Sequence, residues 1–232
     1  MSRLAARFAL DCRVQFRSGF YTVSVIVAGL AAILLSFLDE EALAWVLPLV
    51  LFENTIINTF FFVAGLILLE KAEGSLGAEA VTPLTDGEYL ISKVATLTLL
   101  TVVEGVALTL LTYGLPQSLP LLAFGLTTAS LIFTLAGLAV MTRYTSVNEF
   151  LMPSIPYTIG LCIPMLVSFG LVEGRAVVFH PLQPSMDALT AAFEGVDARP
   201  LAYLLFAPLP WIGVAVLLAR RLFKRRQAAT TR

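Results

Sequence analysis

Runs of about twenty apolar residues, repeated along the chain, restrict its fold more than any other feature. An α-helix needs a run of this length to cross the hydrocarbon core of a bilayer. Charged residues make up 13% of the chain, against about 25% in soluble domains. The runs do not alternate as membrane β-strands do, and backbone groups in lipid need partners within the protein. We therefore expect an all-α integral membrane protein with a single transmembrane domain, residues 1–232.

Six runs have the length of transmembrane helices. They cover residues 20–38, 47–69, 94–113, 119–141, 151–172 and 201–219. The fifth contains Pro153, Pro156 and Pro164, which predict kinks or a broken first turn because proline lacks a backbone donor. Six crossings would place both ends of the chain on the same side of the membrane.

Residues 1–18 are too charged to cross the bilayer, but they have an amphipathic pattern. At helical spacing one side carries Ala5, Phe8, Ala9, Cys12 and Phe16, and the other carries Arg3, Arg7, Asp11, Arg13 and Arg17. The pattern predicts an interfacial helix with its arginines at headgroup level; a frayed basic leader is the alternative. The next apolar run exceeds the roughly 7–15 residues of a signal peptide, so we expect it to be retained.

The distribution of basic residues predicts the orientation. With six crossings, all but two of the 15 Lys and Arg residues fall on the side of the termini, and the exceptions are Arg175 and Arg199. Lys and Arg accumulate on the cytoplasmic side of membrane proteins. We expect a multi-pass protein of the cytoplasmic (inner) membrane, with both termini and residues 70–93 in the cytoplasm.

The segment 173–200 is expected outside the cytoplasm and is too polar for a full span. Apolar residues recur in it at spacings of three and four: Leu182, Met186, Leu189, Ala192 and Phe193. This periodicity favours a short amphipathic helix that re-enters the bilayer before the sixth span. A plain surface loop is the alternative.

The sequence lacks the residues that several kinds of chemistry require. There is no G-x-x-x-x-G-K-[ST] loop for nucleotide phosphates and no H-E-x-x-H motif. The two cysteines, Cys12 and Cys162, are far apart, and His180 is the one histidine. The net charge of −1 gives no sign of nucleic-acid binding. We expect no catalytic, cofactor-binding or metal-binding residue on this chain, and therefore no enzyme activity of its own.

Two carboxylates fall inside predicted spans, Glu53 in the second and Glu104 in the third. An ionisable group at that depth costs about 2.5–3.5 kcal/mol on insertion scales, so it faces a cavity or a partner. Each is a candidate for a substrate-lining or proton-bearing group. A protonated carboxyl group hydrogen-bonded to a neighbouring helix is the other interpretation.

The polar segment 70–93 separates the second and third spans. It contains five acidic residues, and Thr85-x-x-Glu88 fits a capping box at the start of the third helix. Before it, a short piece with Leu76 and Val81 ends at Thr82-Pro83. Small apolar residues within an acidic rim suit a knob that fits a groove on a partner protein; a solvated loop is the alternative.

The same segment resembles the cytoplasmic loop of type-2 ABC transporter permeases. The resemblance lies in Glu70-x-x-Glu73-Gly74-Ser75-Leu76, then Val81-Thr82-Pro83-Leu84, then Tyr89-Leu90-x-Ser92-Lys93-Val94. The order of a basic amphipathic helix, six spans and a long outer segment before the sixth span is similar along nearly the whole chain. Within the family, the chain looks most like the short permeases of fluoroquinolone and multidrug exporters.

The resemblance implies a transport subunit that works with separate proteins. A second permease, identical or a sister subunit, would complete the pathway, and two ABC ATPase subunits would bind ATP and Mg. The implied ATPase-coupling residues are Glu70, Glu73, Gly74, Leu76, Val81, Pro83, Leu84, Glu88, Tyr89 and Lys93. The candidate substrate-pathway residues are Glu53, Asn54, Asn58, Phe61, Phe62, Glu104 and Tyr157.

Three other functions remain open at this point. A haem or lipid exporter permease belongs to the same superfamily. An ion-coupled carrier would use Glu53 and Glu104 as proton sites. A membrane anchor that recruits a cytoplasmic protein would transport nothing.

Overall fold

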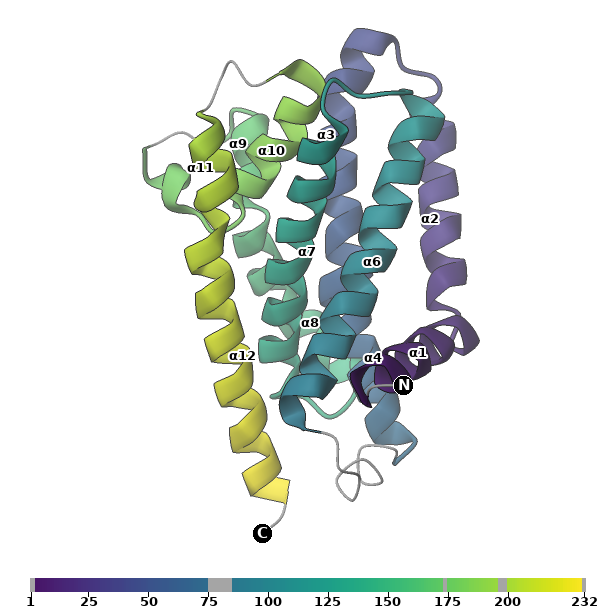
Figure 1. Cartoon of the computed structure of the whole chain (residues 1–232), viewed down its shortest axis with the longest axis vertical. Helices are drawn as coiled ribbons and strands as arrows, with labels where there is room; N and C mark the ends of the chain where they lie inside the picture. Colours follow the sequence, from purple (N-terminus) through teal and green to yellow (C-terminus); the bar gives the residue numbers. More distant parts are fainter. Residues whose placement is uncertain (1–2, 75–84, 173–174, 196–199, 231–232) are drawn as a thin grey trace.

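The computed structural model describes residues 3–74, 85–172, 175–195 and 200–230, and every regular element in these ranges is helical. The helices run roughly parallel in one bundle, except α1, which crosses one end of it (Figure 1). The elements are α1 (Arg3–Arg17), α2 (Phe20–Leu35), α3 (Glu40–Ile56), η1 (Ile57–Phe61), α4 (Phe62–Ala72), α6 (Asp86–Thr112), α7 (Leu119–Met141), α8 (Val147–Leu161), α9 (Ile163–Ser168), η2 (Arg175–Phe179), α10 (Gln183–Glu194), α11 (Leu201–Phe206) and α12 (Pro208–Thr230).

Within the part of the chain that the structure describes, four helical segments are long and apolar enough to cross a membrane: 40–72, 87–112, 119–141 and 201–222. A fifth follows if α1 and α2, bent by 62° at their junction, count together. The first of these segments joins α3, η1 and α4 into one continuous helix, with a single π-helical turn at η1. The chain is thus a multi-pass helical membrane protein, as the apolar runs predicted.

The predicted fifth span is divided into two short helices. α8 ends at Leu161 and α9 begins at Ile163, with Cys162 between them. Pro164 stands at the start of α9, where its missing N–H costs least. Neither piece alone has the length of a span, so the count of six crossings is not established by the helices themselves.

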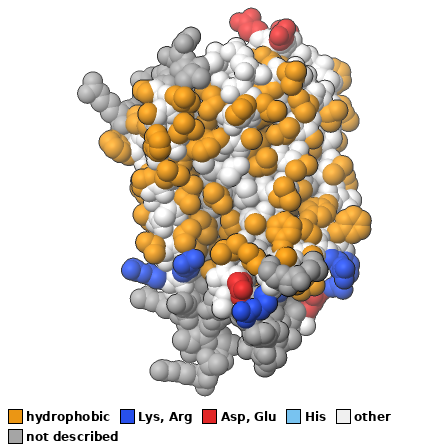
Figure 2. All heavy atoms as spheres, in the orientation of Figure 1, with side chains coloured by type: hydrophobic (Ala, Val, Ile, Leu, Met, Phe, Trp, Pro, Cys, Tyr) orange, Lys and Arg blue, Asp and Glu red, His pale blue; other side chains and the backbone are white. Residues whose placement is uncertain are grey.

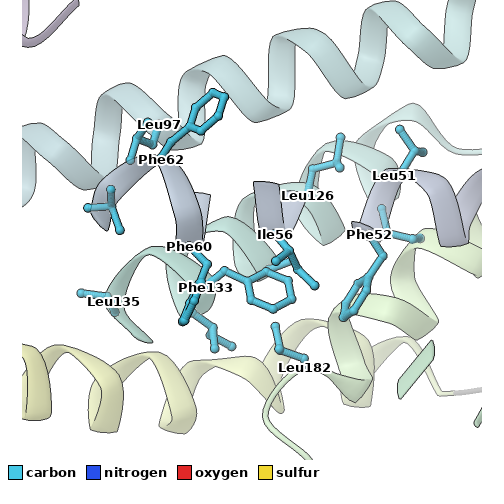
Figure 3. Packing of buried hydrophobic residues seen from close by; sticks show 14 of the residues in the cluster. Leu51, Phe52, Ile56, Phe60, Phe62, Leu97, Leu126, Phe133, Leu135 and Leu182 are labelled. Atoms are coloured by element: carbon cyan, nitrogen blue, oxygen red, sulfur yellow. The ribbon is translucent and has the colours of Figure 1, made fainter. Parts of the chain in front are cut away.

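The core lies between the long helix 40–72 and α7. Phe52 and Phe133 pack edge to face with ring centroids 5.3 Å apart, and Ile56, Phe60 and Phe133 lie close together in Figure 3. Gly137 lets α7 approach η1 closely, because a Cβ atom there would come within 2.6 Å of the Phe60 carbonyl oxygen. Small residues at such contacts are typical of helix packing in membranes.

The segment 173–200 contains α10 where an amphipathic helix was predicted, and its re-entry into the bilayer stays a prediction. Leu182, Met186, Leu189 and Phe193 are all buried, and α10 packs against α7 and α3. The polar outer segment therefore carries an apolar face into the bundle, whereas a plain surface loop would expose it.

The outer surface is apolar around its middle and charged at its ends. Figure 2 shows a hydrophobic band, with Lys and Arg gathered below it and acidic residues both above it and beside the basic ones. Exposed side chains in the band include Val25 and Leu34 of α2 and Leu217 of α12. We call the end that carries α1 and the last turns of α12 the basic end (Figure 1). An apolar band of this kind fits a protein surrounded by lipid.

Candidate functional site

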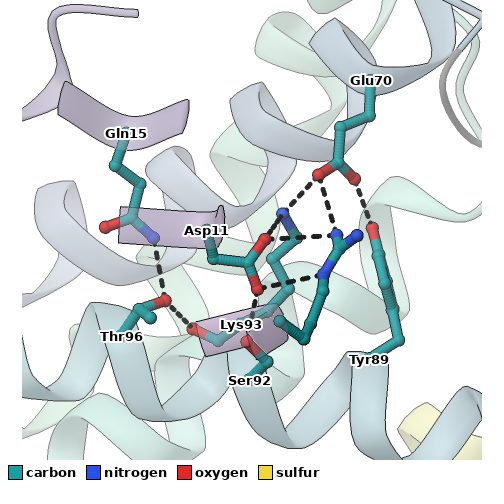
Figure 4. A network of polar contacts seen from close by, with 8 residues as sticks. Asp11, Gln15, Glu70, Tyr89, Ser92, Lys93 and Thr96 are labelled. Carbon is teal, nitrogen blue, oxygen red and sulfur yellow. Dashed lines mark hydrogen bonds and ion pairs between the residues drawn. The ribbon is translucent and has the colours of Figure 1, made fainter. Parts of the chain in front are cut away.

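Four buried charged side chains meet at the basic end of the bundle. Arg7 and Asp11 come from α1, Glu70 from α4 and Lys93 from α6 (Figure 4). None of the four is more than 6% exposed. We call them the buried ion quartet; with two cations and two anions, it is neutral when all four are charged.

Lys93 joins the two acids of the quartet. Its Nζ lies 2.7 Å from Asp11 Oδ1 and 2.5 Å from Glu70 Oε1. Arg7 Nη2 is 3.1 Å from both Glu70 Oε1 and Asp11 Oδ1. Charges excluded from water in this way need partners that are close and fully hydrogen-bonded.

Neutral groups also donate to the second oxygen of each carboxylate. The Tyr89 hydroxyl donates to Glu70 Oε2 at 2.6 Å, and Ser92 Oγ donates to Asp11 Oδ2 at 2.5 Å. The Arg7 guanidinium also lies over the Tyr89 ring, 4.8 Å from its centroid. α1 is further tied to α6 by Gln15, whose Nε2 donates to Thr96 Oγ1 at 2.8 Å. The result is a polar joint among α1, α4 and α6.

This joint corrects the expectation for residues 1–18. The helix is present, but Arg7 and Asp11 are turned into the protein and are not at headgroup level. Phe16 and Leu10 of the same helix are exposed. The amphipathic pattern identified two faces, and Arg3, Arg13 and Arg17 of the polar face are exposed. Arg7 and Asp11 instead contact buried charges of α4 and α6, where the pattern predicted water.

The predicted coupling residues fall into four groups. Glu70, Tyr89 and Lys93 are in the polar joint, and Leu76, Val81, Pro83 and Leu84 lie outside the described residues. Glu73 and Gly74 follow α4, where Gly74 has a φ of 72° and the exposed Glu73 forms a 3.7 Å ion pair with Arg17. The predicted capping box is confirmed: Thr85 Oγ1 accepts from the Glu88 N–H, and Glu88 Oε2 accepts from the Thr85 N–H.

Glu104 lies in a second buried polar cluster, midway along the bundle. Asn54 Nδ2 donates to its Oε1 at 2.8 Å, and Asn58 Nδ2 donates to its Oε2 at 2.6 Å. Ser24 of α2 donates to the same Oε2. Three donors from α2, α3 and η1 therefore converge on one carboxyl group of α6, which is hydrogen-bonded to its neighbouring helices.

Glu53 has a different environment from Glu104, although it is next to Asn54 in sequence. Its side chain is exposed and lines a groove of about 410 Å³ between α2, α3 and α9. Its neighbours in the groove are apolar, among them Val27, Val50 and Met165. Glu53 is thus an accessible carboxylate on an otherwise apolar wall.

The structure does not gather the predicted substrate-pathway residues into one cavity. Phe61 packs against Phe60 and Phe150, and Phe62 packs edge to face on Phe20 with centroids 4.9 Å apart. Tyr157 is exposed on α8, where its hydroxyl accepts from Arg143 Nη1 at 3.2 Å. Within the set, Glu53 and Asn54 line the groove.

Sequence reasoning missed Asp11, Ser92 and Ser24 as functional candidates. Asp11 follows Arg7 by one helical turn in an otherwise basic helix, which could have indicated a paired acid. Ser92 belongs to the segment that resembles ABC permeases, but the resemblance assigns no role to its side chain. Ser24 lies between two valines in the first span, and a polar residue in such surroundings often finds a polar partner on another helix.

Comparison with known proteins agrees with this architecture. The model of the fluoroquinolones export permease protein family matches residues 2–230. The fluoroquinolones export permease proteins of Mycobacterium tuberculosis strains CDC 1551 / Oshkosh and H37Rv are each 29% identical over 230 residues. Each match covers 97% of this chain and 96% of the relative. Since the family model extends over nearly the whole chain, this protein belongs to the fluoroquinolones export permease protein family.

Proposed function

We propose that this chain is the membrane permease subunit of an ATP-driven exporter of drug-like, lipophilic molecules. The observation that carries the proposal is the match of the family model over residues 2–230. The names of the M. tuberculosis relatives support export of fluoroquinolones as the kind of transport. ATP hydrolysis would take place on a separate ATPase chain, since this sequence contains no P-loop motif.

In the proposed topology the chain crosses the inner membrane six times, with both termini in the cytoplasm. The crossings are α2, the helix 40–72, α6, α7, α8 with α9, and α11 with α12. α8 and α9 together extend from Val147 to Ser168, about 33 Å at 1.5 Å per residue, which is enough to span the hydrocarbon core. α10 would re-enter from outside, and α1 would rest on the inner surface with Leu10 and Phe16 in lipid.

Energy would enter through the segment between α4 and α6. We propose that a partner ATPase docks on residues 70–84 and binds ATP with Mg. Glu70 at one end of this segment and Lys93 beyond the other end are joined by a 2.5 Å ion pair, and both are joined to α1. A push on the segment would then move α1, α4 and α6 together, as a rigid body. Two permeases and two ATPases would form the complete exporter.

The test is a double substitution in the proposed docking segment, Glu73→Ala with Leu76→Ala. We expect export of a fluoroquinolone to be lost, and the purified chain to bind its ATPase at least about tenfold more weakly, a change of about 1.4 kcal/mol. Insertion into the membrane should be unchanged. The matched control removes the same residue types from the opposite end, Glu41→Ala with Leu38→Ala, both exposed. Full export and full ATPase binding by the Glu73/Leu76 variant would refute the proposed docking site.

A second candidate function is an ion-coupled carrier. The observation that favours it is the accessible carboxylate of Glu53 beside the groove. Glu104 suits the carrier less well, because three donors already occupy its oxygens. The two functions differ in the energy source that transport requires.

A further inference from the structure

The groove between α2, α3 and α9 has a single acidic group among its lining residues. Glu53 and Asn54 are polar, and the other lining residues are apolar, from Val27 and Ala31 of α2 to Met165 and Phe169. The Asn54 Nδ2 donates to Glu104, whereas its buried Oδ1 has no hydrogen-bond partner among the described residues. Glu53 has no hydrogen-bond or ion-pair partner among the described residues. The groove has a volume of about 410 Å³, within the range of about 300–1,000 Å³ typical of small-molecule sites.

Aromatic rings stand at one part of the groove. Trp45 of α3 and Phe169, which follows α9, both line it. Their ring centroids are 5.5 Å apart at an interplanar angle of 80°. Both side chains are also exposed, so their free faces are available to a flat ring or a cation.

The depth of Glu53 excludes a lipid headgroup as its ordinary partner. At about 1.5 Å per residue, Glu53 lies about 9 Å along the helix from Leu47, where the predicted second span begins. The hydrocarbon core of a bilayer is about 30 Å thick. A headgroup amine held at the surface does not reach that depth.

A second copy of this chain cannot supply a basic side chain there either. The sequence has no Lys or Arg between Arg17 and Lys71, nor in residues 94–142, 144–174 and 200–219. These ranges include all six predicted spans. In a pair of identical chains, the positive charge that would complement Glu53 therefore comes from a bound molecule.

We propose that this groove binds an amphiphilic organic cation, with a protonated amine on the Glu53 carboxylate and an aromatic ring near Trp45 and Phe169. This inference rests on the proposed function as a drug permease and names the substrate class of that function. A cation offsets the cost of a carboxylate in apolar surroundings. The apolar walls bind the rest of the molecule. A neutral analogue makes these apolar contacts but forms no ion pair with Glu53.

The test uses Trp45 as the reporter on the purified chain, without ATPase. Trp45 and Trp211 are the two tryptophans, so Trp211→Phe leaves the groove residue as the one indole fluorophore. The probe is 1-(1-naphthyl)piperazine, and its N-acetyl amide is the uncharged match. We expect saturable quenching by the amine, with an affinity about tenfold or more above that of the amide, because only the amine carries a charge.

Three variants in this background assign the binding to the groove. Glu53→Gln should reduce the affinity for the amine to that for the amide. Glu41→Gln, at the exposed end of the same helix, should change neither affinity. Ala31→Phe, which fills the groove from α2, should weaken the binding of both probes. Equal affinities for amine and amide in the parent, or an unchanged affinity for the amine in Glu53→Gln, would overturn the inference.

Binding and transport are separate measurements, so the two proposals fail separately. ATP-dependent export combined with no charge preference at Trp45 would refute the cation site and leave the exporter standing. Charge-selective binding lost in Glu53→Gln, combined with no export of any drug, would refute the exporter and leave the cation site standing.

Discussion

Lys93 and Asp11 are 82 positions apart in the chain, yet Lys93 Nζ lies 2.7 Å from Asp11 Oδ1 and both side chains are completely buried. Lys93 also contacts Glu70, so α1 and the two helices that flank the proposed docking segment share one cation. Burial makes this contact costly to break, because a remaining charge would have neither water nor a counter-ion.

The first prediction follows from that contact. Lys93→Met leaves Asp11 and Glu70 with one cation, Arg7, and we expect it to lower the free energy of unfolding by about 3–5 kcal/mol. The measurement is thermal or denaturant unfolding of the purified chain in detergent. Arg17→Met is the control: its ion pair with Glu73 is exposed, so we expect a loss of under about 1 kcal/mol.

A double substitution separates lost charge pairing from lost packing. Asp11→Asn added to Lys93→Met restores neutrality in the quartet, and we expect it to regain part of the lost stability. Losses of equal size in the Lys93 and Arg17 variants would show that the quartet does not stabilise the fold.

The two carboxylates of the bundle should respond differently to substitution. Glu104→Leu leaves the buried Asn54 and Asn58 amide groups without an acceptor, each at a cost of about 1–3 kcal/mol. Glu104→Gln keeps one acceptor oxygen and should cost less. Glu53→Gln changes an exposed group and should stay within about 0.5 kcal/mol of the parent. The same unfolding assay measures all three, and a greater loss for Glu53→Gln than for Glu104→Leu would contradict these environments.

Helix packing gives a prediction at Gly137. A methyl group there would come within 2.6 Å of the Phe60 carbonyl oxygen and 2.8 Å of Val63, so Gly137→Ala should destabilise the fold by about 1–3 kcal/mol. A Cβ atom at Gly213 of α12 would have no neighbouring atom within 4 Å. Gly213→Ala should therefore be neutral or slightly stabilising, as expected from helix propensity. Comparing the two melting temperatures checks the prediction, and equal effects would mean that α7 and η1 do not pack this closely.

His180 makes stability depend on pH. Its Nδ1 accepts from the Leu182 N–H at 3.2 Å, so Nε2 carries the proton and donates to the Gly160 carbonyl at 3.1 Å. Burial lowers the pKa of His180, and the bond to Gly160 opposes this in part. The folded state therefore favours the neutral ring. Its contribution to stability is present above the ordinary pKa of about 6.5 and is lost as pH falls through the lowered folded value.

We therefore expect His180→Gln to remove part of the acid sensitivity. Between about pH 7.5 and about pH 5, the melting temperature of the parent should fall further than that of the variant. Parallel curves for the two proteins would show that the pKa of His180 is the same in the folded and unfolded states.

The features that could be predicted from the sequence are those with local causes. The apolar runs predicted the long helices, the Thr85 and Glu88 pair predicted the start of α6, and the spacing from Leu182 to Phe193 predicted α10. Each depends on residues within a few helical turns of one another. The cap at Thr85 is fully formed for that reason.

The polar joint could not be predicted in the same way, because its partners are far apart in sequence. A hydrophobic pattern identifies the polar face of α1, but it does not tell whether Arg7 and Asp11 face water or buried charges on α4 and α6. Likewise, Glu53 and Asn54 are adjacent on one helix, and both were predicted to line the substrate pathway. The packing of α2 and α6 against this helix brings Asn54 to Glu104 and leaves Glu53 in the groove. The prolines of the fifth run predicted kinks or a broken first turn, but Pro153 and Pro156 lie inside α8 and the first turn is intact. The helix ends instead at Leu161, and α9 begins with Pro164 in its first turn.

The energy source of transport tests the central claim most directly. The measurement is uptake of a fluorescent fluoroquinolone into inside-out vesicles that contain this chain and its partner ATPase. We predict uptake that requires ATP, persists when an uncoupler removes the proton gradient, and is lost with Glu73→Ala and Leu76→Ala. Uptake that continues without ATP and stops with the uncoupler would contradict the account and establish an ion-coupled carrier.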